Sequence, residues 1–356
     1  MSYPLQTARK QVRAALLLGL AGVLASGCAG TSATIEDHRG VNTIEMDSTS
    51  RNENNKANET TLEKSAQARQ VLMDTRFENG FNLLGIRSID TGEQILDVLN
   101  YGQAYGVYPY WRLAQWGTRH NLAGTAAEEL AAGVYRYANP GKSVTVDTGT
   151  GTLTLRATAS EEYIEPRQEG EDWPHLLVEQ HMEQPAYIEQ LQELRATAEL
   201  RLTQFEDRLA AADYDPARHA AQFSWYLSIQ NRNSASPHYG DYLWFGMPIF
   251  DNRQAVVQES YFQDGGKEDT THKFIYNMSA AHYMDQGLVA GEWMRMDIDI
   301  LPYVQRAIEL AYEEGFLQGT TPEELGVANM NIGWELPGTF DVEMELRDLS
   351  LAAVEK

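Results

Sequence analysis

Five stretches of this chain alternate apolar and polar residues with a period of two, and this alternation constrains the fold more than any other feature. One set of side chains in each stretch would face a core and the other would face away, as in half-buried β-strands. Gly- and Pro-containing turns separate the stretches. We therefore expect an all-β fold, a large antiparallel β-sandwich of the jelly-roll type. The stretches are GTLTLRATA (151–159), QFSWYLSIQNR (222–232), EWMRMDIDIL (292–301), VANMNIGWE (327–335) and TFDVEMELRDL (339–349).

A few helices are expected between the strands. The segment Pro302–Gly319 has Pro at its start, one apolar face and Gly near its end, which is typical of a helix closing one end of a sandwich. Thr125–Ala138 is also predicted to be a helix. Gln184–Asp207 is ambiguous, because its first half has a helical period and its second half could be a strand. Arg69–Leu122 either wraps the sandwich or supplies its first strands.

The first thirty residues have the organisation of an export signal. Arg9, Lys10 and Arg13 precede an apolar run, 14–24, that is too short to cross a bilayer as a helix. The residues LASGC then end at Cys28, the only cysteine of the chain. This leader resembles the lipobox of bacterial lipoproteins. The resemblance implies cleavage before Cys28 and lipidation of its sulfur, and the following Ala and Gly imply the outer membrane. An ordinary secretory signal is the alternative.

These features predict three parts of the chain. Residues 1–27 would be a lipoprotein signal peptide, and residues 28–68 a lipidated cysteine followed by a disordered tether rich in Ser, Thr, Asn and Glu. Residues 69–356 would form a single elaborated β-sandwich domain. The expected location is the bacterial cell envelope, facing the periplasm or the cell surface, with the membrane contacted only through the lipid anchor.

The net charge excludes one class of partner. The chain has 28 Lys and Arg against 51 Asp and Glu, a formal charge of −23 at pH 7. A nucleic acid, itself a polyanion, would be repelled by such a surface. A solvated acidic face that keeps the protein soluble explains the remaining excess of acid without any partner.

Three of the predicted strands carry recognition-type side chains on their polar faces, and none of these side chains is a lysine. Planar or directional donors and acceptors of this kind suit sugar hydroxyls, and aromatic rings offer a face for stacking. A polysaccharide or oligosaccharide is therefore the expected ligand. A buried polar layer beneath a covering loop is the alternative. The three rows are Tyr226, Ser228, Gln230 and Arg232; Trp293, Arg295, Asp297 and Asp299; and Asn329, Asn331 and Glu335.

The stretch YGDYLWFGMPIFDNR, 239–253, is apolar on both sides of its alternation and is predicted to be a central strand that is covered on both faces. It follows the row that ends at Arg232 after one Pro-containing loop, so the two strands should pair as a hairpin. Leu243, Phe245 and their neighbour Met247 would face the core. Tyr242 and Trp244 would form the floor of a sugar site.

Two further clusters could carry chemistry. In DWPHLLVEQH, 172–181, an extended strand would place His175, Glu179 and His181 on one face. About 13 Å separates residues four apart in a strand, too far for all three side chains to share one ion, so no metal site is predicted. Satisfied structural groups on a half-buried strand are the simplest interpretation. No cofactor is expected, although a calcium ion could bind in the loop DGGKED, 264–269, which otherwise forms a turn.

The stretch DVEME, 341–345, resembles the alternating acidic motif of jelly-roll glycoside hydrolases, with Asp and Glu in a different order. A solvated acidic strand is the competing interpretation. The whole body resembles secreted jelly-roll carbohydrate-binding or polysaccharide-degrading proteins. Should the chain be an enzyme, a lyase would need a base, His175 or Tyr226, and a cation to neutralise a uronate carboxylate, Arg232 or Arg295.

Three functions follow from these observations. The first is a cell-surface lipoprotein that binds polysaccharide on the concave face of a β-sandwich. The second is a polysaccharide lyase or glycoside hydrolase of the same architecture. The third is a structural envelope lipoprotein with protein partners.

Overall fold

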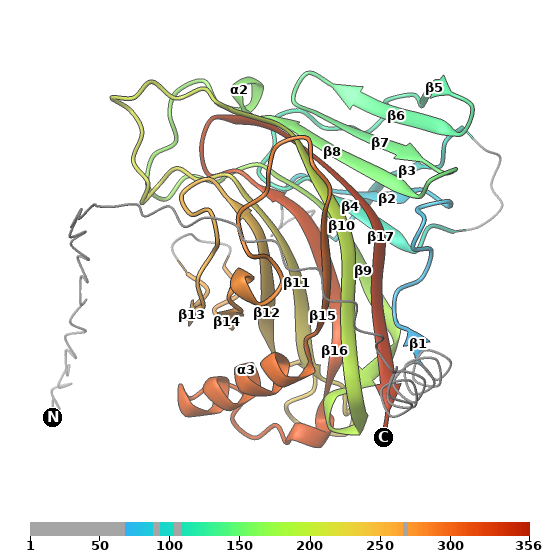
Figure 1. The fold of residues 1–356 in the computed structure, drawn as a ribbon, viewed down its shortest axis with the longest axis vertical. Coiled ribbons are helices and arrows are strands. Elements are labelled where there is room, and N and C mark those ends of the chain that lie inside the picture. Colours follow the sequence, from blue (N-terminus) through green and yellow to red (C-terminus); the bar gives the residue numbers. More distant parts are fainter. Residues whose placement is uncertain (1–67, 88–92, 103–107, 266–269) are drawn as a thin grey trace, which may run out of the picture. The chain divides into compact units, whose positions relative to one another are not determined.

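Two β-sheets packed face to face make up most of the structure, a computed structural model that describes residues 68–87, 93–102, 108–265 and 270–356 (Figure 1). All of these residues fall in one compact unit, Asn55–Lys356. The all-β prediction is confirmed. The predicted signal peptide, Cys28 and the tether lie outside the described residues.

The first sheet has eight strands in the described part of the chain. Its order is β15 (Met294–Asp299), β10 (Leu191–Asp207), β17 (Phe340–Glu355), β8 (Thr152–Thr158), β7 (Lys142–Asp147), β6 (Val134–Asn139) and β5 (Glu128–Ala131), with β1 (Arg69–Gln70) also paired to β17.

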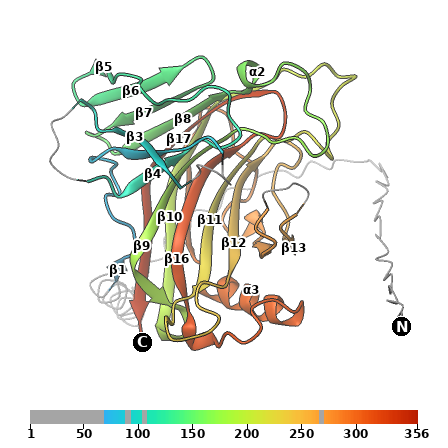
Figure 2. The same cartoon turned by 180° about the vertical axis from the view of Figure 1, so that it is seen from behind.

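The second sheet has nine described strands, and its central strands lie side by side in Figure 2. Its order is β13 (Ser260–Gln263), β14 (Phe274–Asn277), β12 (Tyr242–Asp251), β11 (Gln222–Asn231), β16 (Leu325–Glu335), β9 (His175–Tyr187), β4 (Trp111–Ala114), β2 (Phe81–Leu84) and β3 (Ile95–Leu99). Among the described strands only two pairs are parallel, β12 with β14 and β2 with β4. The segment before Leu122 thus supplies strands β1 to β4, as one of the two expectations had it.

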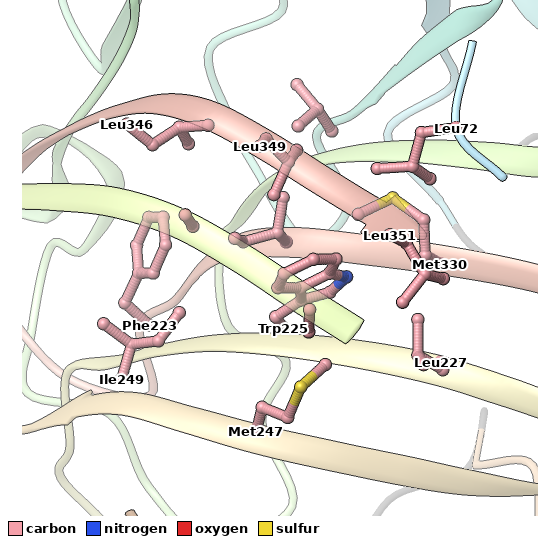
Figure 3. Packing of buried hydrophobic residues seen from close by; sticks show 14 of the residues in the cluster. Leu72, Phe223, Trp225, Leu227, Met247, Ile249, Met330, Leu346, Leu349 and Leu351 are labelled. Carbon is pink, nitrogen blue, oxygen red and sulfur yellow. The ribbon is translucent and has the colours of Figure 1, made fainter. Parts of the chain in front are cut away.

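The period-two stretches explain why the sheets stack. All five lie in strands, namely β8, β11, β15, β16 and β17. Their apolar sets meet in one core, where Phe223, Trp225 and Leu227 of β11 pack towards Leu346 and its neighbours on β17 (Figure 3). Because side chains alternate along each strand, the opposite face of the nine-stranded sheet is left for the polar set.

The helix α3 (Leu301–Glu313) confirms the helix predicted for Pro302–Gly319, although it ends at Glu313 and the last six residues of that segment are not helical. Its apolar face is buried through Val304, Ala307, Ile308 and Ala311. It contacts both β10 and β12, one strand from each sheet, and so covers one end of the sandwich (Figure 1). No helix in the described residues is both long enough and apolar enough to cross a membrane.

The predicted helix at Thr125–Ala138 is wrong. The segment forms the antiparallel hairpin of β5 and β6, and Gly133 sits at its turn with φ +78°. On β6, Tyr137 is buried and its hydroxyl accepts a hydrogen bond from the Tyr101 backbone N–H at 2.6 Å. The alternation in Val-Tyr-Arg-Tyr therefore prevails over the helical propensity of the Glu- and Ala-rich residues before it.

The ambiguous segment Gln184–Asp207 is almost entirely extended. It comprises the end of β9, a short 3-10 turn (η1, Ile188–Gln190) and the seventeen-residue strand β10. A register shift between Leu191 and Glu193 interrupts the alternation at the start of β10. Such a bulge adds one residue to one strand and displaces the period, which is why the apolar spacing imitated a helix.

Candidate binding cleft

A cleft of about 760 Å³ lies on the polar face of the nine-stranded sheet. Strands β9, β16, β11, β12 and β14 supply its floor, and loops before β9 and after β12 and β13 add to its walls. The period of two that buries Trp225 and Leu227 on the core side turns Tyr226 and Ser228 into the cleft. The same alternation acts on each of the five strands, so the sequence pattern itself builds the cleft floor.

The strand register arranges the floor in three rows that cross the sheet. Each row takes one residue from β9, β16, β11 and β12 in turn. Every member lines the cleft except Gly246, which is the β12 residue of the middle row. The rows are His175, Glu335, Gln222 and Asp251; Glu179, Asn331, Tyr226 and Gly246; and His181, Asn329, Ser228 and Trp244.

Two tryptophans and a histidine form one corner of the cleft, and we call Trp116, Trp173 and His175 the tryptophan corner. The His175 ring lies 5.8 Å from each indole, stacked on Trp173 and edge-on to Trp116. Its Nδ1 lies 2.9 Å from the Trp173 carbonyl oxygen. A carbonyl can only accept, so Nδ1 carries the proton and Nε2 faces the Glu335 carboxylate at 3.5 Å. Trp173 also donates its indole N–H to Glu335 at 3.2 Å.

The diagonally opposite corner is also aromatic, and we call Tyr242, Trp244 and Phe262 the far corner. The rings of Tyr242 and Trp244 meet edge to face at 5.3 Å. Lys273 lies 5.3 Å from the centre of the Tyr242 ring, and its ammonium is also paired with Asp241 at 2.6 Å. Phe262, on the edge strand β13, is 49% exposed and lines the cleft.

Glu179 lies in the middle row with its carboxylate 3.1 Å from Nε of Arg112 on β4. Only 13% of its side chain is exposed. Burial raises the pKa of Glu179 to about 7, although the charge of Arg112 acts in the opposite direction. A carboxyl group that still holds its proton near neutral pH can donate that proton to a ligand.

His181 is the neighbour of Glu179 on the same face of β9, and it contacts the Arg112 guanidinium. Burial lowers the pKa of His181, and the positive charge of Arg112 lowers it further. The imidazole is therefore neutral at physiological pH, which leaves it able to accept one hydrogen bond and donate another.

Tyr226 occupies the centre of the floor because Gly246 opposite it has no side chain. A Cβ on Gly246 would stand 2.5 Å from Cε1 of Tyr226 and 2.2 Å from Oδ1 of Asn277. Burial raises the pKa of Tyr226, and the carboxylate of Glu335 adds to the rise. The phenol therefore stays protonated at neutral pH and offers a hydrogen-bond donor rather than a base.

The structure brings together most of the residues predicted for ligand binding. Tyr242, Trp244, Asn329, Asn331 and Glu335 all line the cleft, as do Tyr226 and His175. Tyr242 and Trp244 lie on β12, which pairs with β11 as predicted, although their side of β12 is open to the cleft and not covered.

Two predicted residues lie on β11 or just beyond its end and are not part of the cleft lining. Gln230 donates to the Gly240 carbonyl at 3.1 Å. Arg232 donates to the Gln230 side chain at 2.7 Å and lies 5.9 Å from the centre of the Tyr239 ring. Their hydrogen bonds brace the loop between β11 and β12.

The row that contains Trp293, Arg295 and Asp297 lies elsewhere. These residues are on or next to β15 at the edge of the eight-stranded sheet, and they face away from the core. Arg295 pairs with Asp297 at 3.0 Å, and Trp293 is stacked between the guanidinium groups of Arg201 and Arg347, 4.6 and 4.1 Å from its ring. None of the three lines the cleft.

The acidic stretch DVEME also lies outside the cleft lining, on β17. Its three carboxylates are engaged within the protein. Asp341 binds Arg208 at 2.8 Å and Ser160 at 3.0 Å, Glu343 accepts from Thr203 at 2.8 Å, and Glu345 pairs with Arg201. DVEME is thus an acidic strand outside the cleft lining, but it is not simply a solvated one, because Asp341 is buried.

No group of three potential metal ligands occurs among the described residues. Part of the loop at 264–269, where calcium was considered, lies outside the described residues.

Sequence reasoning missed Arg112, Trp116 and Trp173. Arg112 and Trp116 come from the early segment, for which no individual strand was assigned, and Trp173 comes from the turn before β9. A signal existed for Trp173, because it stands two residues before His175 in the cluster already singled out.

Comparisons with solved structures find cellulases, xyloglucanases and xylanases. A cellulase derived from the Cel12A cellulase of Rhodothermus marinus is 12% identical, with 68% of this chain and 99% of that chain covered and a TM-score of 0.38. A family 12 xyloglucanase from Bacillus licheniformis is 8% identical, covering 71% and 97%, with a TM-score of 0.38. The family 11 xylanase from Neocallimastix patriciarum is 9% identical, covering 66% and 97%, with a TM-score of 0.34. No family model and no curated protein matches the chain.

Proposed function

We propose that this protein binds a neutral polysaccharide in the cleft of the nine-stranded sheet. The observation that carries the proposal is that aromatic rings and uncharged hydrogen-bonding side chains share one hollow surface. Trp116, Trp173 and Trp244 bring indole rings to the cleft, while Asn329 and Asn331 offer donors and acceptors for hydroxyl groups. The ring of Trp173 already contacts His175 and the guanidinium of Arg167. Similarity at the TM-scores given above adds no weight, so the proposal depends on these residues alone.

The charge of the cleft supports an uncharged ligand. Its described lining contains six acidic side chains and two arginines. Arg253 forms a bidentate ion pair with Asp251, in which Nε donates to Oδ1 at 2.8 Å and Nη2 donates to Oδ2 at 2.6 Å. The charge of Arg253 is therefore already compensated. A uronate polymer would meet repulsion here. Arg232 and Arg295, the residues considered for neutralising a uronate, are not in the lining. The acidic lining residues are Glu93, Asp172, Glu179, Asp251, Asp264 and Glu335.

Affinity electrophoresis of the purified protein tests this function. Gels containing β-glucan, xylan or mannan should retard the protein, and gels containing alginate or pectate should not. The variant Asn331→Ala should be retarded less than the wild type, since it removes one donor and one acceptor from the floor. Retardation only by the anionic polymers would contradict the proposal. If no polysaccharide retards the protein, glycan binding is contradicted and the role of a structural envelope lipoprotein remains.

Hydrolysis of the bound chain is a second candidate, favoured by the raised pKa of Glu179. A glycoside hydrolase needs one protonated and one ionised carboxyl group on either side of the scissile bond. Glu335 is the other glutamate of the central floor, one strand and four residues away by register. This places the two Cα atoms about 14 Å apart, which favours the wider carboxyl spacing of inverting enzymes over that of retaining ones.

Release of new reducing ends from the same neutral polysaccharides tests the hydrolase. The wild type should produce them below pH 7, where Glu179 is protonated, and lose the activity above it. Glu179→Gln and Glu335→Gln should each abolish release while retaining retardation in the gel. Binding without products in the wild type would leave a binding protein.

We also keep the proposal that the chain is an outer-membrane lipoprotein anchored through Cys28. The support is the leader ending in LASGC and the single cysteine of the sequence. Expression with radiolabelled palmitate should label the wild type and not Cys28→Ser. Labelling of neither, with export of both, would favour the ordinary secretory signal.

A further inference from the structure

The cleft has clusters of aromatic side chains at two opposite corners, and the ring of Tyr226 lies on the floor between them. The tryptophan corner belongs to the β4 and β9 side, next to the row of His175. The far corner belongs to the β12 to β13 side, next to the row of Trp244. Both corners line the same cleft.

The strand register gives the separation of the two corners. Going from His175 to Trp244 crosses three strand spacings, from β9 through β16 and β11 to β12. It also moves six residues along β11, from Gln222 opposite Asp251 to Ser228 opposite Trp244. With strands about 4.8 Å apart and about 3.4 Å per residue, the corners are about 25 Å apart along the sheet.

The floor between the corners is low. Gly333 of β16 has no room for a side chain, because a Cβ there would lie 2.2 Å from the Leu176 carbonyl oxygen. Its partner across the pair to β11 is Ser224, another small residue, which lines the cleft. Beyond them, the ring of Tyr226 rests over Gly246. Between the corners the floor therefore carries small residues and the ring of Tyr226, and it offers hydrogen bonds along the diagonal.

The tryptophan corner is held from below by a buried ion pair. Nζ of Lys142 lies 3.0 Å from Oε1 of Glu162, and their side chains are 1% and 3% exposed. Glu162 accepts hydrogen bonds from the Thr118 hydroxyl and the Arg119 backbone N–H, both at 2.5 Å, and Lys142 donates to the His120 carbonyl. These contacts fix the loop that follows Trp116. A corner ordered before binding loses less entropy when a ligand stacks on it.

We propose that the ligand is an extended chain that stacks one sugar ring at the tryptophan corner and another at the far corner at the same time. This inference rests on the proposed glycan-binding function and adds the length of the recognised segment. Once one corner is occupied, the second ring is held near its own corner at a high effective concentration. The cleft thereby selects polymer segments over short oligosaccharides, since only a chain about 25 Å long reaches both corners.

Isothermal titration with neutral oligosaccharides of increasing length tests the inference. The probes are cello-, xylo- and manno-oligosaccharides, from disaccharides to octasaccharides, with the full-length protein. In the series that binds, affinity should rise steeply up to the length that reaches both corners and then level off. For the longest member, Trp173→Ala and Trp244→Ala should each weaken binding about tenfold, and the double variant about a hundredfold. For the disaccharide, which is too short to reach both corners, the loss of affinity in the double variant should be smaller than the product of the losses in the two single variants.

Two further variants separate stacking from other causes. Trp173→Phe keeps an aromatic face and loses the hydrogen bond to Glu335, so it should recover most of the affinity lost in Trp173→Ala. Trp293→Ala removes an indole from the other sheet and should bind every probe like the wild type. All variants are compared at equal folded fraction by circular dichroism.

The outcomes distinguish the inference from the function on which it rests. A wild type that binds the disaccharide as tightly as the octasaccharide would overturn the two-corner inference and leave glycan binding intact. Loss of affinity in only one of the two Trp→Ala variants, at every length, would do the same. Absence of binding to all neutral probes and polysaccharides would overturn the proposed function itself.

Discussion

The two outward-facing surfaces of the sandwich carry similar residues and differ in what those residues contact. On the outer face of the eight-stranded sheet, Trp293 is enclosed by Arg201 and Arg347, and the arginines are paired in turn with Glu345 and Glu199. On the cleft face of the nine-stranded sheet, Trp244 meets only other aromatic rings within the described contacts, and the cleft lies open above it. The composition of a strand face thus suggests recognition, but only the neighbouring strand decides whether its side chains are already satisfied.

The difference has an electrostatic cause. On the outer face, opposite charges lie directly across from each other in the register, as with Glu199 and Arg347 or Arg201 and Glu345. Such cross-strand pairs stabilise the sheet and leave little binding capacity for a ligand. On the cleft face, a charged cross-strand pair also occurs between Arg112 and Glu179. Between the central strands β11 and β16, however, the opposing residues are uncharged, with Tyr226 opposite Asn331 and Ser228 opposite Asn329. Neutral side chains such as Asn329 and Ser228, which are hydrogen-bonded to each other at 3.0 Å, can exchange such bonds for bonds to a sugar at a small cost.

The largest expected effect comes from breaking the ion pair beneath the tryptophan corner. Lys142→Met leaves the Glu162 carboxylate buried without its cation, and loss of one partner from a buried pair typically costs about 3–5 kcal/mol. We expect a loss of that order in the free energy of unfolding measured in urea. Lys273→Met, which removes a partly exposed pair with Asp241, should cost less than about 1 kcal/mol. Equal losses in the two variants would show that the buried pair is not what holds the corner.

The next effect concerns the pH dependence contributed by Glu179. Its pKa is raised from 4.5 in the unfolded chain to about 7 in the folded protein, so the folded state binds more protons between these values. Stability from this group is therefore present below about pH 4.5 and is lost as the pH rises through 7. At pH 8, the free energy of unfolding of Glu179→Gln should exceed that of the wild type by at most about 3 kcal/mol, so the variant should also unfold at a higher temperature. This difference between variant and wild type should narrow towards pH 5. A gap independent of pH would mean that Glu179 is ionised in the folded protein throughout.

The fold was predictable from the sequence because alternation is a local property. Strands β8, β11, β15, β16 and β17 each show it within ten or so residues, and the hairpin of β11 and β12 follows from their closeness in the chain. Where a bulge shifts the period, as at the start of β10, the pattern imitates a helix. Where a turn depends on one residue, as at Gly133, helix-favouring neighbours conceal it.

The site was only half predictable, for a different physical reason. Tyr226, Trp244 and Asn331 could be assigned to one face of their strands, but which sheet each strand joins is set by contacts distant in sequence. The row of Trp293 shows this, because its composition resembles that of Tyr226 while β15 pairs with β10 in the other sheet. Arg112 could not be identified from the sequence for the same reason, because only its pairing with Glu179 across β4 and β9 gives it a role in the site.

A smaller effect is expected at the middle of the cleft floor. Gly246→Ala would place a Cβ 2.2 Å from Asn277 Oδ1 and 2.5 Å from the Tyr226 ring, so both side chains must move. Overpacking of this kind costs about 1–3 kcal/mol, and displacement of Tyr226 should also weaken glycan retardation. Gly265→Ala is the matched control, since its Cβ would be 3.7 Å from the nearest atom. Retardation unchanged in Gly246→Ala, with stability reduced, would remove Tyr226 from the binding surface.

The smallest effect is expected on the outer face. Trp293→Ala removes two contacts between the indole and guanidinium groups, each worth about 0.5–1 kcal/mol at an exposed site. The charged partners keep their cross-strand pairs, so the loss in the free energy of unfolding should stay near 1–2 kcal/mol and shrink in high salt. Retardation in glycan gels should not change. A loss of retardation comparable to that of Trp244→Ala would show that both faces bind glycan and would remove the distinction between satisfied and open surfaces.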